Sequence, residues 1–185
     1  ELDEGSVWEA IADPITHGLG NVMWIVDLNR QSLDRVIPGI RIHQWRAQFE
    51  AAGWHVVEVK YGPQLRAAFA EPGGAELEAW IDAMPNEKYQ SLFGLESAAV
   101  RQRFLEGAPA AVQDLCAGLD DVALAELVTD LGGHDPVAML RAYAECDAVS
   151  DRPSVVFAYT VKGWGLPTAG SARNHSSLLS KEQID

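Results

Sequence analysis

Apolar positions follow two different periods along the chain. At 22–27 and 155–160 they form short, almost continuous runs, which are typical of strands buried within a parallel sheet. Between residues 42 and 54 they recur at helical spacing up to Gly53, a residue that suits a helix end, and a group of valines at 56–59 follows. This strand–helix–strand order predicts an α/β fold with a parallel sheet flanked by helices.

The middle of the chain has only the helical period. Over about residues 63–148, apolar side chains follow helical spacing between breaks that contain Gly and Pro. We therefore predict one α/β domain over residues 1–165 with this helical insertion, and a mobile loop or tail at 166–185. The chain opens on Glu-Leu-Asp-Glu-Gly-Ser, without an initiator Met. We expect the domain to be incomplete at its N-terminus.

The charge balance narrows the range of partners. Asp and Glu number 27 against 14 Lys and Arg, which gives a net charge of −13, and such a surface repels nucleic-acid phosphates and anionic membranes. No apolar run approaches the roughly 18 residues of a membrane span, and the acidic start lacks the basic end of a signal peptide. We expect a cytoplasmic protein that binds neither nucleic acid nor membrane, with Cys116 and Cys146 as buried thiols.

Polar residues stand where the predicted strands end. Asn29 and Gln31 follow the first strand, Tyr61 the second and Lys162 the last. Because the carboxyl ends of parallel strands share one sheet edge, we expect Asn29 and Lys162 to approach one anionic ligand. An amide oxygen and a nearby backbone carbonyl also suit Mg²⁺, which usually takes substrate phosphates as well. Taken singly, Asn29 fits a turn residue and Lys162 a solvated loop lysine.

His175 is the most informative of the five histidines. It stands in the tail after Lys162, where a lid can bring an imidazole over a reacting centre. His134 precedes a predicted helix, and capping by Asp135 explains that stretch without catalysis. The chain has neither a Gly-x-Ser-x-Gly elbow nor a Gly-x-Gly-x-x-Gly or Walker loop. The remaining histidines have no ligand-like spacing and favour structural roles: His17, His43 and His55.

Several separated segments, in order along nearly the whole chain, together resemble one family. It is the transketolase superfamily of thiamine-diphosphate-dependent enzymes, and within it the homodimeric bacterial decarboxylating component of pyruvate dehydrogenase. The resemblance identifies the fold as the diphosphate-binding domain of such an enzyme. The segments are 1–4 (Glu-Leu-Asp-Glu), 29–34 (Asn-Arg-Gln-Ser-Leu-Asp), 49–54 (Phe-Glu-Ala-Ala-Gly-Trp), 89–90 with 100–101, 132–136 (Gly-Gly-His-Asp-Pro) and 160–165 (Thr-Val-Lys-Gly-Trp-Gly).

The resemblance implies a set of cofactor ligands. In this family a Gly-Asp-Gly motif opens the thiamine-diphosphate site and an Asn closes it. Glu1 would follow that triplet directly and lie at the cofactor. Asn29 would give its side-chain oxygen to Mg²⁺, and Gln31 its backbone carbonyl. Lys162 matches a lysine near the cofactor. Without the resemblance, the acidic start fits a solvated run of charges better than a cofactor site.

Catalytic roles are also implied by the resemblance. His175 resembles the histidine of a mobile loop that helps to receive the lipoyl group, and Glu4 matches an acidic position near the dimer interface. The implied activity is decarboxylation of a 2-oxo acid, pyruvate, with transfer of the acyl group to lipoamide on an acyltransferase core. A Glu from another domain would activate the cofactor, so we expect this chain alone to be inactive. A transketolase-like ketol transferase and a noncatalytic interaction domain of the same fold are the alternatives.

Overall fold

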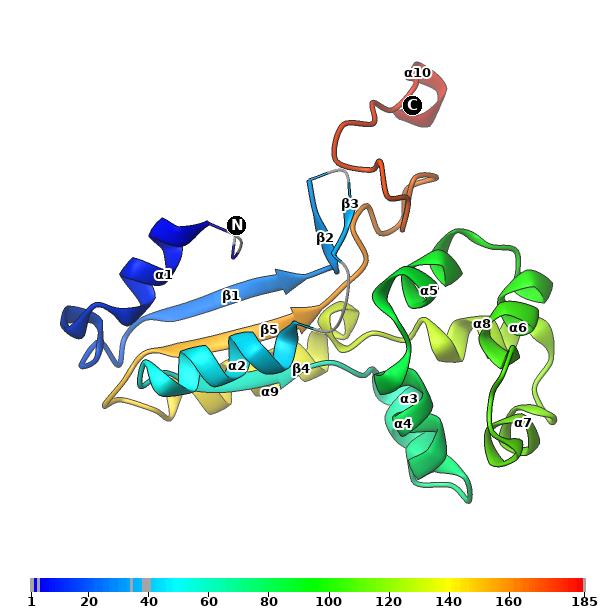
Figure 1. The fold of residues 1–185 in the computed structure, drawn as a ribbon, viewed down its shortest axis with the longest axis horizontal. Helices are drawn as coiled ribbons and strands as arrows, with labels where there is room; N and C mark the ends of the chain where they lie inside the picture. Colours follow the sequence, from blue (N-terminus) through cyan, green and yellow to red (C-terminus); the bar gives the residue numbers. More distant parts are fainter. Residues whose placement is uncertain (1, 3, 34, 38–40, 185) are drawn as a thin grey trace.

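The centre of the computed structural model, which describes residues 2, 4–33, 35–37 and 41–184, is a three-stranded parallel sheet. Its strands are β1 (Met23–Leu28), β5 (Ser154–Tyr159) and β4 (His55–Val59), in the order β1-β5-β4. Leu28 lies opposite Tyr159, and Val59 lies opposite Ala158. All three carboxyl ends therefore meet at one edge of the sheet (Figure 1), and the predicted parallel α/β fold is confirmed.

The central strand β5 is buried along its whole length. Val155, Phe157 and Tyr159 belong to the main hydrophobic core, while Val156 packs in a second cluster with Ala138 and other residues of helix α9 (Pro136–Asp147). Successive side chains of a strand point to opposite faces, so a strand that is covered on both faces has no polar positions. This explains the continuous apolar run.

An aromatic cluster fills the face of the sheet that α1 (Gly5–Ala12) and α2 (Ile42–Ala51) cover. The ring of Phe49 meets those of Trp24, Trp54 and Phe157 edge-on, at centroid distances of 6.0, 5.4 and 5.6 Å, a geometry that aromatic pairs favour. The indole Nε1 of Trp54 donates to the carbonyl of Ile11 at 3.1 Å. Apart from the indole N–H groups of its two tryptophans, the cluster is apolar.

The middle of the chain forms a helical layer beside the sheet (Figure 1). It shares a continuous core with the sheet, because Leu77, Phe104 and Leu124 belong to the same hydrophobic cluster as Phe157. The α-helices of this layer are α3 (Pro63–Phe69), α4 (Gly74–Ala83), α5 (Asn86–Ser91), α6 (Ser97–Leu105), α7 (Ala110–Cys116) and α8 (Asp121–Val128).

A small hairpin over the carboxyl edge has no counterpart in the sequence-based prediction. It consists of β2 (Gln31–Ser32) and β3 (Arg35–Val36), which pair antiparallel. Arg30 and Leu33 adopt positive φ angles of 61° and 54°, a conformation that L residues adopt rarely. Single turns of 3-10 helix and a last short helix complete the elements: η1 (Pro14–Thr16), η2 (Leu92–Gly94), η3 (Gly132–His134) and α10 (Lys181–Ile184).

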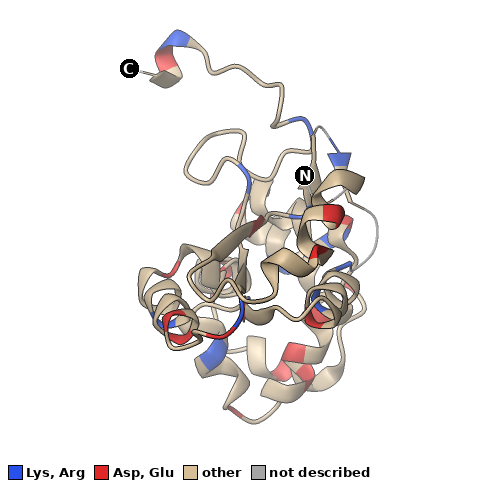
Figure 2. Ribbon diagram, turned by 90° about the vertical axis from the view of Figure 1, so that its left-hand side faces the viewer, with Lys and Arg blue, Asp and Glu red and all other residues tan. Residues whose placement is uncertain are grey.

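Charge and burial agree with parts of the sequence analysis. Figure 2 shows acidic residues on several helices of the described structure, in keeping with the net charge of −13. Cys116 and Cys146 are free and buried, as predicted, and burial raises the pKa of both thiols. Among the described residues, none of the helices has the length and apolar character needed to span a bilayer.

Candidate functional site

A cavity of about 550 Å³ lies at the carboxyl edge of the sheet, within the size range of small-molecule sites. Its walls come from the ends of β1 and β5, from the hairpin, and from parts of α2, α4 and α5. Six residues were predicted to form the site, and one of them, Glu1, lies outside the described part of the chain. The other five all line this cavity: Glu4, Asn29, Gln31, Lys162 and His175.

Asn29 is fixed in position at the end of β1. Its Oδ1 accepts a hydrogen bond from the backbone N–H of Gln31 at 3.0 Å, and its Nδ2 donates to Asp27 at 3.4 Å. Asp27 is held in turn by the hydroxyl of Thr160, just beyond β5. An amide oxygen has two lone pairs, and the turn uses one of them. The turn-residue interpretation of Asn29 is therefore correct, and it leaves acceptor capacity for a cation.

Gln31 joins the hairpin to the segment that follows β5. Its Nε2 donates to the carbonyl of Ser171 at 2.8 Å. Its Oε1 is shut off from solvent and has no hydrogen-bond partner among the described residues. A buried acceptor without a partner is costly to maintain, so this atom marks a place where the protein alone does not complete the polar contacts.

Lys162 contacts the same hairpin. Its Nζ donates to the carbonyl of Leu33 at 3.1 Å. The loop behind it is fixed by Asn174, whose Nδ2 donates to the carbonyls of Lys162 and Thr168 at 2.7 and 2.8 Å. Gly163 has a φ of 72°, and a Cβ at this position would collide with the Asn174 side chain. The ammonium group is thus placed by a tightly packed turn.

His175 and Glu4 occupy the exposed side of the cavity. Both residues are exposed to solvent while lining it. The structure therefore brings Glu4 and His175 to the same cavity as the described candidate cofactor ligands, although these residues stand far apart in the sequence.

His134 has a structural role that differs in part from the expected one. Asp135 caps α9 by accepting from the N–H of Val137 at 3.0 Å, as predicted. His134 itself accepts a hydrogen bond at Nε2 from the N–H of Val161 at 2.9 Å and stacks on Trp164 at 4.7 Å. Burial lowers its pKa, and the Asp27 carboxylate partly opposes that shift. The neutral ring supports the loop that carries Lys162.

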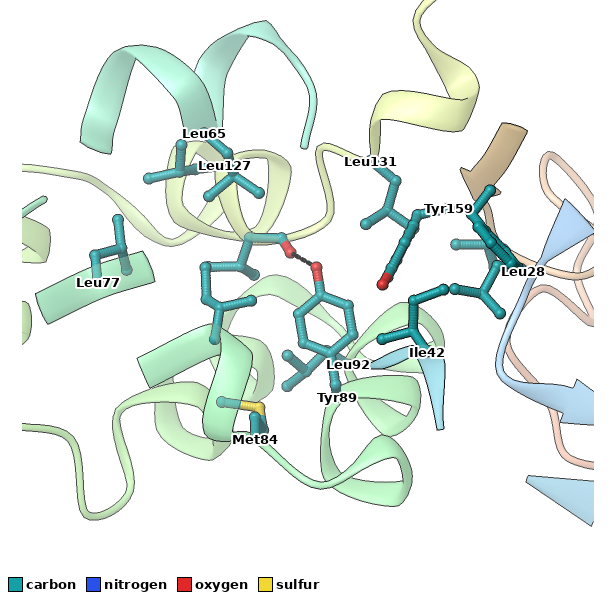
Figure 3. Close-up of a cluster of buried hydrophobic side chains, with 14 of the residues drawn as sticks. Leu28, Ile42, Leu65, Leu77, Met84, Tyr89, Leu92, Leu127, Leu131 and Tyr159 are labelled. Atoms are coloured by element: carbon teal, nitrogen blue, oxygen red, sulfur yellow. Dashed lines mark hydrogen bonds between the residues drawn. The ribbon is translucent and has the colours of Figure 1, made fainter. Parts of the chain in front are cut away.

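Sequence reasoning missed a group of aromatic and cationic residues in the cavity wall. The guanidinium of Arg30 lies 4.5 Å from the ring centre of Tyr89 and 5.5 Å from that of Tyr159. The Tyr89 hydroxyl donates to the carbonyl of Val128 at 2.6 Å, the dashed line in Figure 3, and burial raises its pKa to about 12. The sequence feature that could have indicated this group is Arg30, a charged residue between the two residues expected to bind Mg²⁺.

A second cation on this wall is paired with an acid. Lys60 forms a salt bridge with Asp82, and the Tyr61 hydroxyl also donates to Asp82. Burial is the main cause that raises the pKa of Tyr61, and the hydrogen bond to Asp82 adds to it. The wall therefore combines one neutralised cation, Lys60, with one cation, Arg30, that has no described acidic partner.

The fold around this cavity is transketolase-like. A transketolase from Pichia stipitis, in a structure with xylulose-5-phosphate, superposes on 99% of this chain with a TM-score of 0.50 and 18% sequence identity, and the match covers 17% of that enzyme. This likeness establishes the fold.

The chain is, more particularly, a distant homologue of the bacterial pyruvate dehydrogenase E1 component. It is similar over its full length to the proteins of that name from Buchnera aphidicola of Schizaphis graminum (27% identity), Escherichia coli K12 (25%) and Pseudomonas aeruginosa (28%). It spans 21% of the length of each of these relatives. A comparison with protein-family models finds no match.

Proposed function

We propose that this chain is the diphosphate-binding part of a Mg²⁺- and thiamine-diphosphate-dependent 2-oxo acid dehydrogenase that acts on pyruvate. The observation that carries the proposal is the meeting of Asn29, Gln31 and Lys162 around one cavity at the carboxyl edge of the sheet. That edge is where open α/β folds bind phosphorylated ligands. The homology to E1 components supports the same assignment.

The residues present suit a magnesium diphosphate. The Asn29 Oδ1 and the Gln31 backbone carbonyl are hard oxygen ligands of the kind that Mg²⁺ takes together with phosphate oxygens and water. Lys162 adds a compact positive charge at the hairpin, and Glu1 would add one further contact to the cofactor from outside the described residues. Thiamine diphosphate, when bound, supplies the electron sink for decarboxylation. The chain's own task is to hold and orient it.

The exposed residues suit the second half-reaction. His175 is placed at the cavity opening, where an imidazole can pass a proton to an incoming lipoyl group on an acyltransferase core. We propose that Glu4 faces a second subunit of a cytoplasmic homodimer. Because the chain spans 21% of its E1 relatives, the Glu that activates the cofactor would come from another domain. We therefore expect turnover only from a full-length protein, meaning the complete gene product that contains this chain.

Titration of the full-length protein with thiamine diphosphate and Mg²⁺ tests the proposal. We expect calorimetry to show binding, and Asn29→Ala to weaken it by about 10-fold or more, as is common when a metal site loses a supporting group. Asn21→Ala is the matched control, because Asn21 is an exposed asparagine at the other end of β1 and should leave the affinity unchanged.

Measurements on the same full-length protein distinguish the alternative functions. If the wild type gives no heat of binding, or if Asn29→Ala binds as tightly as the wild type, the diphosphate site is wrong and a noncatalytic interaction domain becomes the better account. Assays with pyruvate, with other 2-oxo acids and with ketose phosphates then distinguish a dehydrogenase from a ketol transferase. Activity on ketose phosphates alone would replace the pyruvate assignment.

A further inference from the structure

The inner wall of the cavity contains a cation that the protein does not neutralise. Arg30 lies directly between Asn29 and Gln31, with a φ of 61°. Its Nη1 is shut off from solvent and has no hydrogen-bond partner among the described residues, and no described carboxylate pairs with it. Burial lowers the pKa of the guanidinium, while the neighbouring tyrosines oppose the shift. A buried, unpaired charge is expensive unless something compensates for it.

Tyr159 supplies a second unsatisfied group on the same wall. The residue is only 4% exposed, and its hydroxyl has no partner among the described residues. Figure 3 shows this hydroxyl pointing into the space between Tyr89 and Ile42, two residues that also line the cavity. The Arg30 guanidinium lies 5.5 Å from the centre of the Tyr159 ring, so two donors without acceptors share one corner.

The neighbouring charges fix the charge that a ligand should carry. Lys60 also lies 5.5 Å from the Tyr159 ring centre, but its charge is balanced by Asp82. Of the three charged side chains at this corner, Arg30, Lys60 and Asp82, only Arg30 has no described counterion. A single negative charge would neutralise it, and a doubly charged ion would leave an excess in a poorly hydrated corner.

We propose that Arg30 and Tyr159 form the floor of a binding site for a small monocarboxylate. A carboxylate matches the planar fork of a guanidinium, because its two oxygens accept two parallel N–H donors. The Tyr159 hydroxyl donates to the same group. The cavity, at about 550 Å³, has room for a small organic acid, and the tyrosine rings that flank the guanidinium hold its plane in place.

The test measures acetate binding to the full-length protein by saturation-transfer NMR on the acetate methyl group. The titration is run at constant ionic strength without Mg²⁺ or thiamine diphosphate, so its outcome is independent of the diphosphate site. We expect Arg30→Gln to weaken acetate binding by about 10-fold or more, because a charge-assisted pair is lost. Tyr159→Phe should weaken it by about 3-fold or more, through loss of one donor.

The controls separate a ligand site from simple packing. Arg46→Gln removes an exposed arginine of α2 that pairs with Glu50 and Glu58, and it should leave acetate binding unchanged. If Arg30→Gln does not fold, Tyr159→Phe decides, because it keeps the ring and removes only the hydroxyl. The proposal is overturned if acetate does not bind, or if Tyr159→Phe binds it as tightly as the wild type.

Discussion

Two regions of this molecule contain buried polar atoms, but they differ in whether those atoms have hydrogen-bond partners. In the cluster around Phe49, the rings pack edge-on and the indole of Trp54 has its carbonyl partner. At the carboxyl edge of the sheet, Arg30 and Tyr159 keep buried polar atoms without partners in the described part of the chain. Protein interiors normally satisfy such atoms. The first region is therefore built for stability, and the second holds contacts open for a ligand.

The largest loss of stability is expected when a side chain in the apolar region is truncated. Phe157 is fully buried at the centre of β5, so Phe157→Ala removes a ring and leaves a cavity. We expect it to lower the free energy of unfolding by about 3–5 kcal/mol, measured by urea denaturation. Leu178→Ala is the control, because Leu178 is 93% exposed and should change stability very little. A loss below about 1 kcal/mol for Phe157→Ala would contradict tight packing of this face.

An intermediate loss of stability is expected from a substitution at Gly133, which packs against the backbone of β5. A Cβ on Gly133 would collide with the carbonyl of Tyr159 and lie 2.7 Å from Cγ2 of Thr160. Overpacking of this kind typically costs about 1–3 kcal/mol, which we expect from Gly133→Ala in the same denaturation assay. Gly118→Ala is the matched control, because a Cβ there meets nothing within 4 Å. If the two variants are equally stable, the backbone around Gly133 moves to accept the added methyl group, and close packing at this edge is contradicted.

The smallest effect concerns pH at the same edge. His134 accepts from the Val161 N–H, so only its neutral form keeps this hydrogen bond. Its pKa is lowered in the folded protein, so the unfolded chain binds the proton more readily. This contribution is therefore complete above the ordinary histidine pKa of about 6.5 and is lost progressively as the pH falls below it.

Denaturation at pH 8 and at pH 5.5 checks this expectation. The wild type should lose more stability between these values than His134→Gln, which has no imidazole to protonate. Because other groups titrate in the same range, the quantity to compare is the difference between the two proteins rather than either slope alone. An identical pH dependence in both would show that His134 does not contribute.

Much of the apolar framework follows from the sequence. The run at 155–160 corresponds to β5, because a strand that is covered on both faces has few polar positions. The run at 22–27 corresponds to β1, but this strand lies at the edge of the described sheet with Ile25 and Asp27 exposed, so the expectation that it is buried within the sheet was wrong. The hairpin was missed, since its strands have two residues each and its positive-φ positions, Arg30 and Leu33, are not glycines. The short α5 falls within the helical stretch expected at about 63–148, but its contact with a distant segment at Val128 could not be predicted.

The candidate site, like the fold, could be predicted from the sequence only in part. Asn29 and Lys162 could be placed at one edge from the sequence, because parallel strands bring their carboxyl ends together. The structure adds that Lys162 reaches the hairpin at Leu33. The pairing of Arg30 with Tyr89 and Tyr159 could not be predicted, since it depends on how the helical layer docks against the sheet. Periodicity identifies which face is buried, but not which side chains meet.

The strand order carries a consequence for synthesis of the protein. The last strand in the sequence, β5, lies between β1 and β4, so the two earlier strands share no hydrogen-bonded edge until residues 154–159 have left the ribosome. While residues 60–153 are being made, β1 and β4 each present open backbone groups, a state that favours mispairing. Early folding must therefore rely on local helices, and sheet closure is expected to be the slow step.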